Sequence, residues 1–79
     1  MNNNDKYDLS FTKTFGIIKK KLPKLKYRDI QEWDSVGHMN LISTIEEKFD
    51  IQMQIDDIID FSSFKKGKTI LKRYKVKIK

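Results

Sequence analysis

Apolar residues recur along this chain at helical spacing, and that spacing predicts four helices. Near the N-terminus they are separated by four, four, three and four positions, which predicts one apolar face on a helix over about Asp5–Lys21. The residues of this face are Tyr7, Phe11, Phe15, Ile18 and Leu22. Pro23 blocks further helix because it lacks an N–H and restricts the residue before it.

Residues 23–34 are expected to form a long connecting loop. Leu25, Ile30 and Trp33 are apolar and are expected to hold this loop against the core. A long ordered loop in so short a chain often has a functional role.

The second helix is expected to begin at Asp34 and Ser35, where Asp34 can act as the N-cap. Asp50 ends its apolar pattern. Its core face combines five residues within one side of a helical wheel: His38, Leu41, Ile42, Ile45 and Phe49.

A short third helix is predicted around Asp56–Asp60, and Ser62 and Ser63 offer an N-cap for a fourth. The core side of the fourth helix is expected to contain Phe64, Ile70 or Leu71, and Tyr74. Residues 72–79 alternate with a period of two, which is compatible with a frayed helix end or an extended tail.

The predicted fold is therefore all-α: a small four-helix bundle of three main helices plus one short helix, with a long loop after the first. Residues 1–79 are expected to form a single domain, with fraying at about 1–5 and 75–79.

The small size of the chain bounds its function. A core of 79 residues is marginal and leaves no room for a deep active-site cavity, which favours a carrier, adaptor or binding module over an autonomous enzyme. The sequence has no cysteine and a single histidine, His38, which excludes a disulfide framework, a thiolate nucleophile and a structural zinc site. No metal ligand set and no catalytic residue is predicted, since His38 has no acid–base partner at triad spacing and is expected to pack in the core.

The first five residues are polar and predict no secretory signal, and no apolar run is long enough to span a membrane. The expected location is the cytoplasm.

The net charge of +6 is unevenly distributed. Residues 1–32 hold eight basic and four acidic residues, residues 33–64 hold one basic and seven acidic residues, and residues 65–79 hold eight basic residues and no acid. An acidic centre thus lies between two basic flanks and needs an explanation of its own.

The face of the second helix opposite its core stripe carries apolar residues where water is expected. Val36 and Met39 lie there together with acids, an arrangement that suits transient docking of another protein. The candidate docking residues are Val36, Met39, Asn40, Ser43, Glu46 and Glu47. Scattered exposed apolar residues are also ordinary, so the pattern alone leaves both interpretations open.

Ser35, at the start of this helix, is the candidate modification site. A serine here can simply cap the helix or tolerate its first turn. The surrounding stretch Trp33–Ile42, WDSVGHMNLI, resembles the phosphopantetheine attachment signature of acyl carrier proteins, in which Asp-Ser precedes an aliphatic residue and an amphipathic helix. The continuation Ile45–Ile51, IEEKFDI, is similar to the end of that family's second helix, and the resemblance extends from about Tyr7 to Tyr74.

The resemblance implies a cytoplasmic, monomeric carrier that is a covalent cosubstrate of other enzymes and not itself an enzyme. It implies a 4'-phosphopantetheine arm joined to Ser35 through a phosphodiester, so that the chain is a phosphoprotein that holds its cargo as a thioester. A phosphopantetheinyl transferase using coenzyme A and Mg²⁺ would attach the arm and recognise Asp34 and Val36. The other implied partners are acyl ligases, transferases or synthases, with no nucleic acid and no stable membrane insertion.

The sequence also departs from the family's pattern. Its members are usually acidic overall, Gly37 and Asn40 replace frequent acidic residues, and Val36 is smaller than the usual leucine. Gly37 costs about 1 kcal/mol of helix propensity. These departures fit general fatty-acid synthesis less well and favour a specialised pathway, and the Gly-His-Met run resembles carriers of surface-polysaccharide or other specialised biosynthesis.

Two alternatives remain open. The lysine-rich flanks would suit a basic helical module that binds nucleic acid or an anionic membrane, although the central helix is acidic. The second alternative is a protein with the carrier fold that is never modified and acts as a scaffold. Gly67, Lys68 and Thr69 mimic the end of a phosphate-binding loop, but Ser62 occupies the position of its required glycine, so that motif is rejected.

Overall fold

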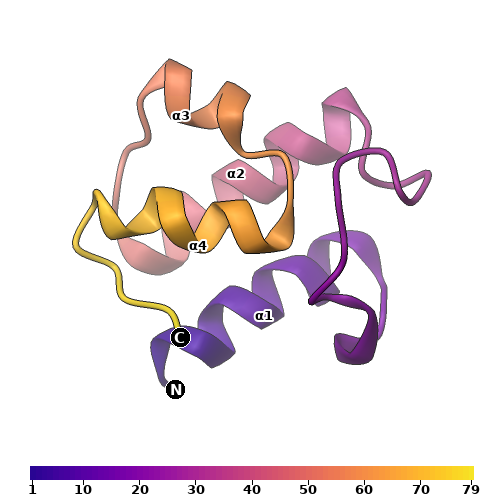
Figure 1. Ribbon diagram of the computed structural model, residues 1–79, viewed down its shortest axis with the longest axis horizontal. Helices are drawn as coiled ribbons and strands as arrows, with labels where there is room; N and C mark the ends of the chain where they lie inside the picture. Colours follow the sequence, from indigo (N-terminus) through magenta and orange to yellow (C-terminus); the bar gives the residue numbers. More distant parts are fainter.

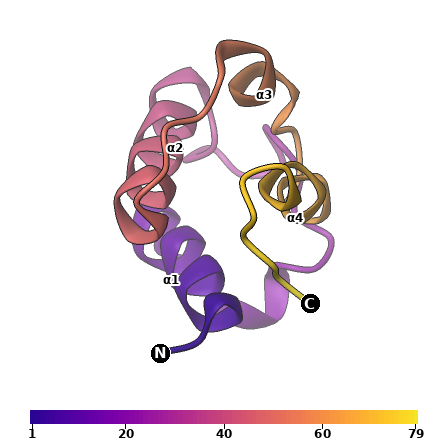
Figure 2. The same ribbon diagram turned by 90° about the vertical axis from the view of Figure 1, so that its left-hand side faces the viewer.

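In the computed structural model, which describes residues 1–79, four α-helices surround an apolar core (Figure 1). The elements are α1 (Asn3–Phe15), the 3-10 turn η1 (Lys19–Lys21), α2 (Ser35–Phe49), α3 (Ile55–Asp60) and α4 (Phe64–Lys72). The predicted all-α bundle with one short helix is confirmed. Figure 2 shows α2 and α4 on opposite sides of the bundle, with α3 at one end and α1 at the other.

Aromatic rings form the centre of the core. The Phe11 ring meets Tyr7, Trp33 and Phe64 edge-on, at centroid distances of 5.0, 5.6 and 5.0 Å. Burial also raises the pKa of Tyr7 well above its usual range, and its hydroxyl donates a hydrogen bond of 2.5 Å to the Phe64 carbonyl. The first helix, the loop and the last helix thus share one cluster.

The first helix ends six residues before the position predicted. Gly16 adopts a left-handed conformation with φ of 66° and its N–H bonds the Thr12 carbonyl, which terminates α1 after Phe15. Ile18, expected in the core, is therefore 60% exposed, whereas Leu22 is still buried because the η1 turn brings the chain back.

The long loop is pinned to the core as predicted. Leu25 and Trp33 are buried, and Ile30 packs against the core at partial exposure. The loop also pairs with the link between α3 and α4: Tyr27 N–H donates to the Ser62 carbonyl and Phe64 N–H donates to the Leu25 carbonyl, each at 2.9 Å.

The predicted helix boundaries beyond the loop agree with the structure. Asp34 and Ser63 are the N-caps of α2 and α4, and Asp50 ends α2 with φ of 52°. Ile70 and Leu71 are both fully buried. Gly67 is buried too, and a side chain there would collide with the Phe61 ring and the Tyr7 hydroxyl, which is a packing reason for this glycine.

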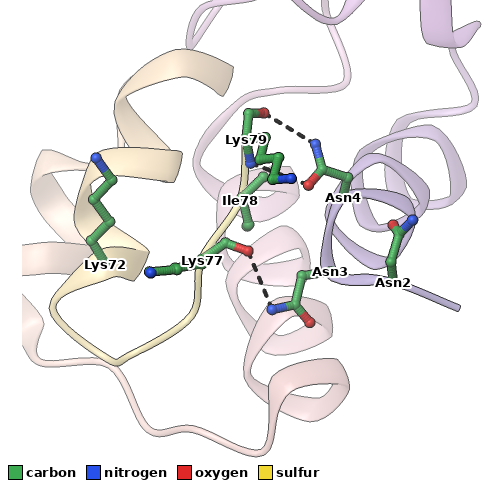
Figure 3. Close-up of a pocket in the computed structure, with 7 residues that line it drawn as sticks. All are labelled: Asn2, Asn3, Asn4, Lys72, Lys77, Ile78 and Lys79. Atoms are coloured by element: carbon green, nitrogen blue, oxygen red, sulfur yellow. Dashed lines mark hydrogen bonds between the residues drawn. The ribbon is translucent and has the colours of Figure 1, made fainter.

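The two termini, where fraying is expected at about 1–5 and 75–79, pack against each other in the structure. Val76 and Ile78 are buried because the period-two alternation of an extended tail places both on one side. The Asn3 and Asn4 amides donate hydrogen bonds of 3.2 and 3.1 Å to the carbonyls of Lys77 and Lys79 (Figure 3). None of the helices is both long and apolar enough to cross a membrane.

Candidate functional site

Ser35 is the first residue of α2 and is exposed to solvent. The capping role at this helix end is filled by its neighbour: Asp34 Oδ1 accepts a hydrogen bond of 2.9 Å from the Gly37 N–H. The simplest structural explanation for a serine at this position, that it caps the helix, therefore does not apply. The Ser35 hydroxyl lies at the positive end of the helix dipole, where attached or bound anions are stabilised.

A largely apolar cleft adjoins Ser35, between the start of α2 and α3. Its volume is about 390 Å³. Five of its eight lining residues are hydrophobic; the lining consists of Tyr27, Ser35, His38, Met39, Ile58, Ile59, Phe61 and Ser62. The cleft thus combines one exposed hydroxyl at its edge with an apolar interior.

His38 joins three segments at this cleft. Its Nδ1 accepts a hydrogen bond of 2.9 Å from Trp33 Nε1 in the loop, and its Nε2 lies 2.8 Å from the Ile58 carbonyl of α3. Because Trp33 can only donate, Nδ1 must be the acceptor and Nε2 carries the proton, which defines the neutral Nε2–H tautomer. As predicted, His38 is a partly buried packing residue, and its hydrogen bonds fix the distance between α2 and α3.

Gly37 allows the first turn of α2 to lie against the loop. A Cβ at this position would overlap the Glu32 carbonyl and lie 3.3 Å from the Phe15 ring. The sequence pattern marked Gly37 only as a departure with a helix-propensity cost, and the close backbone approach is its structural reason.

The exposed apolar surface around Ser35 is larger than the sequence indicated. Val36 and Met39 are 71% and 50% exposed, as expected for docking residues. On α3, Ile55 and Ile59 are 74% and 71% exposed, and Ile59 lines the same cleft as Met39. In the sequence, the spacing of four between Ile55 and Ile59, each followed by an acid, is the signal that could have indicated an exposed stripe.

The polar docking residues predicted on α2 divide into two groups. Asn40, Ser43 and Glu47 are exposed and line one shallow depression with Lys13. Glu46 is different, because its Oε2 accepts a hydrogen bond of 2.8 Å from the Met53 N–H. It therefore holds the connection between α2 and α3, a structural role that the sequence did not indicate.

A buried carboxylate that sequence analysis missed positions α3. Asp57 forms an ion pair with Arg73 and accepts a hydrogen bond of 2.5 Å from the Tyr74 hydroxyl. The Tyr74 oxygen in turn accepts a hydrogen bond of 2.8 Å from the Gln54 N–H. Desolvation by its surroundings, followed by the bond to Asp57, raises the pKa of Tyr74 above its ordinary value of 10.0. The start of α3 is thereby tied to the end of α4.

The largest cavity lies elsewhere, between the N-terminus and the C-terminal tail. It measures about 750 Å³ and has one hydrophobic lining residue, Ile78 (Figure 3). The Asn3 and Asn4 amides on its wall already bond the tail backbone, so it is the crevice left by packing of the termini.

Comparisons of the chain with protein-family models, with curated proteins and with solved structures give no match. The function of the site therefore rests on its own chemistry: an exposed serine at a helix N-terminus, an apolar cleft beside it and an exposed apolar surface around it.

Proposed function

We propose that this protein is an acyl carrier protein that bears a 4'-phosphopantetheine arm on Ser35. The observation that carries the proposal is the position of Ser35. It is exposed at the first position of α2 and lies at the edge of an apolar cleft, and it does not cap the helix because Asp34 does so. The stretch around it, Trp33–Ile42, is the one whose pattern resembles carrier proteins.

The residues around Ser35 fit such an arm. The phosphodiester would lie at the N-terminus of α2, where the helix dipole and free backbone N–H groups favour an anion. When attached, the arm supplies a terminal thiol that holds an acyl group as a thioester. This would provide thioester chemistry in a chain that has no cysteine.

The surroundings of Ser35 also suit transient docking by partner enzymes. Val36 and Met39 on α2 and Ile55 and Ile59 on α3 present apolar contacts, while Glu47, Asp56 and Asp60 are exposed acids on the same helices. Apolar residues give affinity to such contacts, and the acids steer partners that have basic docking surfaces. A phosphopantetheinyl transferase and an acyl ligase, transferase or synthase are the proposed partners.

The departures from the usual pattern assign the carrier to a specialised biosynthetic pathway within this proposal. Gly37 and Asn40 leave the start of α2 without the acids common in the family, and the chain is basic as a whole. Enzymes that dock on the usual acidic pattern would meet fewer charges here, so a dedicated set of partners is favoured.

Intact-protein mass spectrometry tests the proposal. The protein is incubated with coenzyme A, Mg²⁺ and a broad-specificity phosphopantetheinyl transferase, beside Ser35→Ala and the matched control Ser62→Ala, an exposed serine of the same cleft. We expect one phosphopantetheine increment on the wild type and on Ser62→Ala, and none on Ser35→Ala. An increment that persists in Ser35→Ala, or a folded wild type left unmodified by this enzyme and by the cognate transferase, would refute it.

A further inference from the structure

Lysines gather on one side of the molecule, in two segments that are far apart in the sequence. The bridge between Lys26 and Ser63, with the hydrogen bonds that flank it, sets the loop against the start of α4. Lys24 and Lys26 of the loop and Lys65 and Lys66 of α4 thereby lie on neighbouring stretches of backbone. We define the basic face as six exposed residues: Lys20, Lys21, Lys24, Lys26, Lys65 and Lys66.

The charge of the basic face is not neutralised within the protein. The two ion pairs of the structure are Lys19 with Asp8 and Arg73 with Asp57, and neither includes a lysine of the basic face. Asp29 is the acid closest in sequence to Lys26, and its Oδ2 accepts a hydrogen bond from the backbone N–H of Lys26. Six ammonium groups are therefore available to an external anion.

The basic face and the acidic helix α2 lie on different sides of the molecule. In Figure 2 the loop after η1 runs along the side of α4, whereas α2 lies on the other side. The acids Glu46 and Glu47 are on α2, and Asp56, Asp57 and Asp60 are on α3, while α4 has none. The loop itself also carries the exposed acids Asp29 and Glu32. The six lysines of the basic face still outnumber them on this side, so a planar anionic surface would attract the molecule by the basic face.

Three features indicate which anionic partner fits. The six residues of the basic face are lysines, with a single exposed arginine, Arg28, in the same loop, and ammonium groups act as point charges suited to a diffuse anionic surface. Ile18, 60% exposed, directly precedes the lysine run and can enter an interfacial layer. A shallow hollow of about 590 Å³ is lined by Lys20, Lys21 and Lys24, by Pro23, Leu25 and Ile30, and by one acid, Asp29. The three ammonium groups suit the phosphate of a phospholipid headgroup, and the apolar side chains beside them suit the start of its acyl chains.

Nucleic acid fits this face less well. Single strands bind by stacking bases on exposed aromatic rings, and duplex readers use arginine forks in a groove. The loop has two aromatic residues, and neither offers a free ring: Trp33 is fully buried and Tyr27 is half-buried with its ring edge-on to Trp33. The single arginine of the loop, Arg28, lies beside the Tyr27 ring, 5.6 Å from the ring centroid.

We infer that the basic face binds the surface of an anionic phospholipid bilayer peripherally, with α2 directed away from the lipid. The association requires no membrane-spanning segment and does not depend on modification of Ser35. Each lysine near such a surface strengthens binding by about fivefold, and the attraction is screened by salt. The surface would concentrate this protein where membrane-associated substrates are made.

Vesicle flotation tests the inference with the full chain. The probes are phosphatidylcholine vesicles with and without phosphatidylglycerol, at low and high salt. We compare the wild type with Lys20→Glu/Lys21→Glu/Lys65→Glu/Lys66→Glu, and with a control of equal charge change, Lys13→Glu/Lys72→Glu/Lys77→Glu/Lys79→Glu. The wild type and Ser35→Ala are expected to bind only vesicles with phosphatidylglycerol, and binding should fall with salt. The first variant should lose at least about 100-fold in partitioning, far more than the control.

Several outcomes would overturn the inference. They are equal binding to both kinds of vesicle, an equal loss in the two charge variants, and tighter binding to a DNA duplex or single strand than to the anionic vesicles at the same salt. Because Ser35→Ala is included, a negative result here leaves the carrier proposal intact, and failure of Ser35 modification leaves this inference intact.

Discussion

The indole N–H of Trp33 donates a hydrogen bond of 2.9 Å to Nδ1 of His38, and the two rings lie nearly parallel, with an angle of 14° between their planes. Trp33 is fully buried, so this N–H has no water to bond instead. The other ring nitrogen of His38 reaches the Ile58 carbonyl. The His38 side chain therefore forms hydrogen bonds with both the loop and α3. These bonds set the width of the cleft beside Ser35.

Replacing His38 with alanine is expected to destabilise the fold by at least about 2 kcal/mol, because it leaves the buried Trp33 donor unpaired and opens a cavity. His38→Gln offers an acceptor and should lose less. Urea unfolding followed by fluorescence of Trp33, the single tryptophan, measures both variants. An indole N–H resonance that does not move in His38→Ala would argue against the hydrogen bond.

Gly37→Ala tests the close approach between α2 and the loop. Alanine is the better helix former by about 1 kcal/mol, yet its Cβ would overlap the Glu32 carbonyl, and such overpacking costs about 1–3 kcal/mol. A net destabilisation of about 1 kcal/mol is expected in urea unfolding. Asn40→Ala, exposed on the same helix, is the control and should stabilise slightly. A stabilised Gly37→Ala would show that the loop moves freely.

The α2 boundaries could be predicted from the sequence because their causes are local. Asp34 caps the helix through its own side chain and Asp50 ends it by adopting a left-handed conformation. The end of α1 could not be predicted in the same way, since apolar spacing continues through Ile18 and Leu22 and hides the stop at Gly16.

The candidate site was predictable in part for the same reason. Ser35 and its capping neighbour lie side by side in the sequence, and so do Val36 and Met39. The partners of His38 come from the loop and from α3, and the exposure of Ile59 depends on which side of a six-residue helix meets the core. Tertiary packing decides both the partners of His38 and the exposure of Ile59, and a local sequence pattern does not predict tertiary packing.

Asp57→Asn is expected to loosen α3 from α4. The substitution removes the charge that pairs with Arg73, and the half-exposed Arg73 side chain limits the cost to about 1–2 kcal/mol. It should also lower the pKa of Tyr74 toward 10.0, because the hydrogen bond to Asp57 helps to raise it. Urea unfolding and a spectrophotometric tyrosine titration measure the two effects. Asp56→Asn, at the exposed neighbouring residue, should change neither the free energy of unfolding nor the pKa of Tyr74. Equal effects in the two variants would contradict a role for Asp57 in holding α3 to α4.

Stability is expected to fall at alkaline pH because of Tyr7. Burial raises its pKa above the ordinary value of 10.0, so folding favours the protonated hydroxyl. The resulting stabilisation is fully present below about pH 10, and above that value it declines because the unfolded chain ionises first. Urea unfolding between neutral and strongly alkaline pH should show this decline. Tyr7→Phe, which leaves the Phe64 carbonyl without its donor, should be less stable at neutral pH and show a shallower alkaline decline. Parallel pH profiles of the two proteins would exclude Tyr7 as the cause.

The exposed apolar surface around Ser35 makes a prediction that depends on the carrier proposal. Val36→Asp and Ile59→Asp should slow phosphopantetheine transfer by about tenfold or more, because an apolar contact at the centre of a docking surface contributes over about 1 kcal/mol. Both side chains are largely exposed, so the free energy of unfolding should change by less than about 0.5 kcal/mol. Ile18→Asp is the matched control, an equally large change at an exposed isoleucine on another part of the surface. The rate is measured by intact mass at limiting transferase.

If Ile18→Asp slowed transfer as much as Ile59→Asp, added negative charge alone would explain the effect. If Val36→Asp alone slowed it, docking would be confined to α2 and would exclude α3.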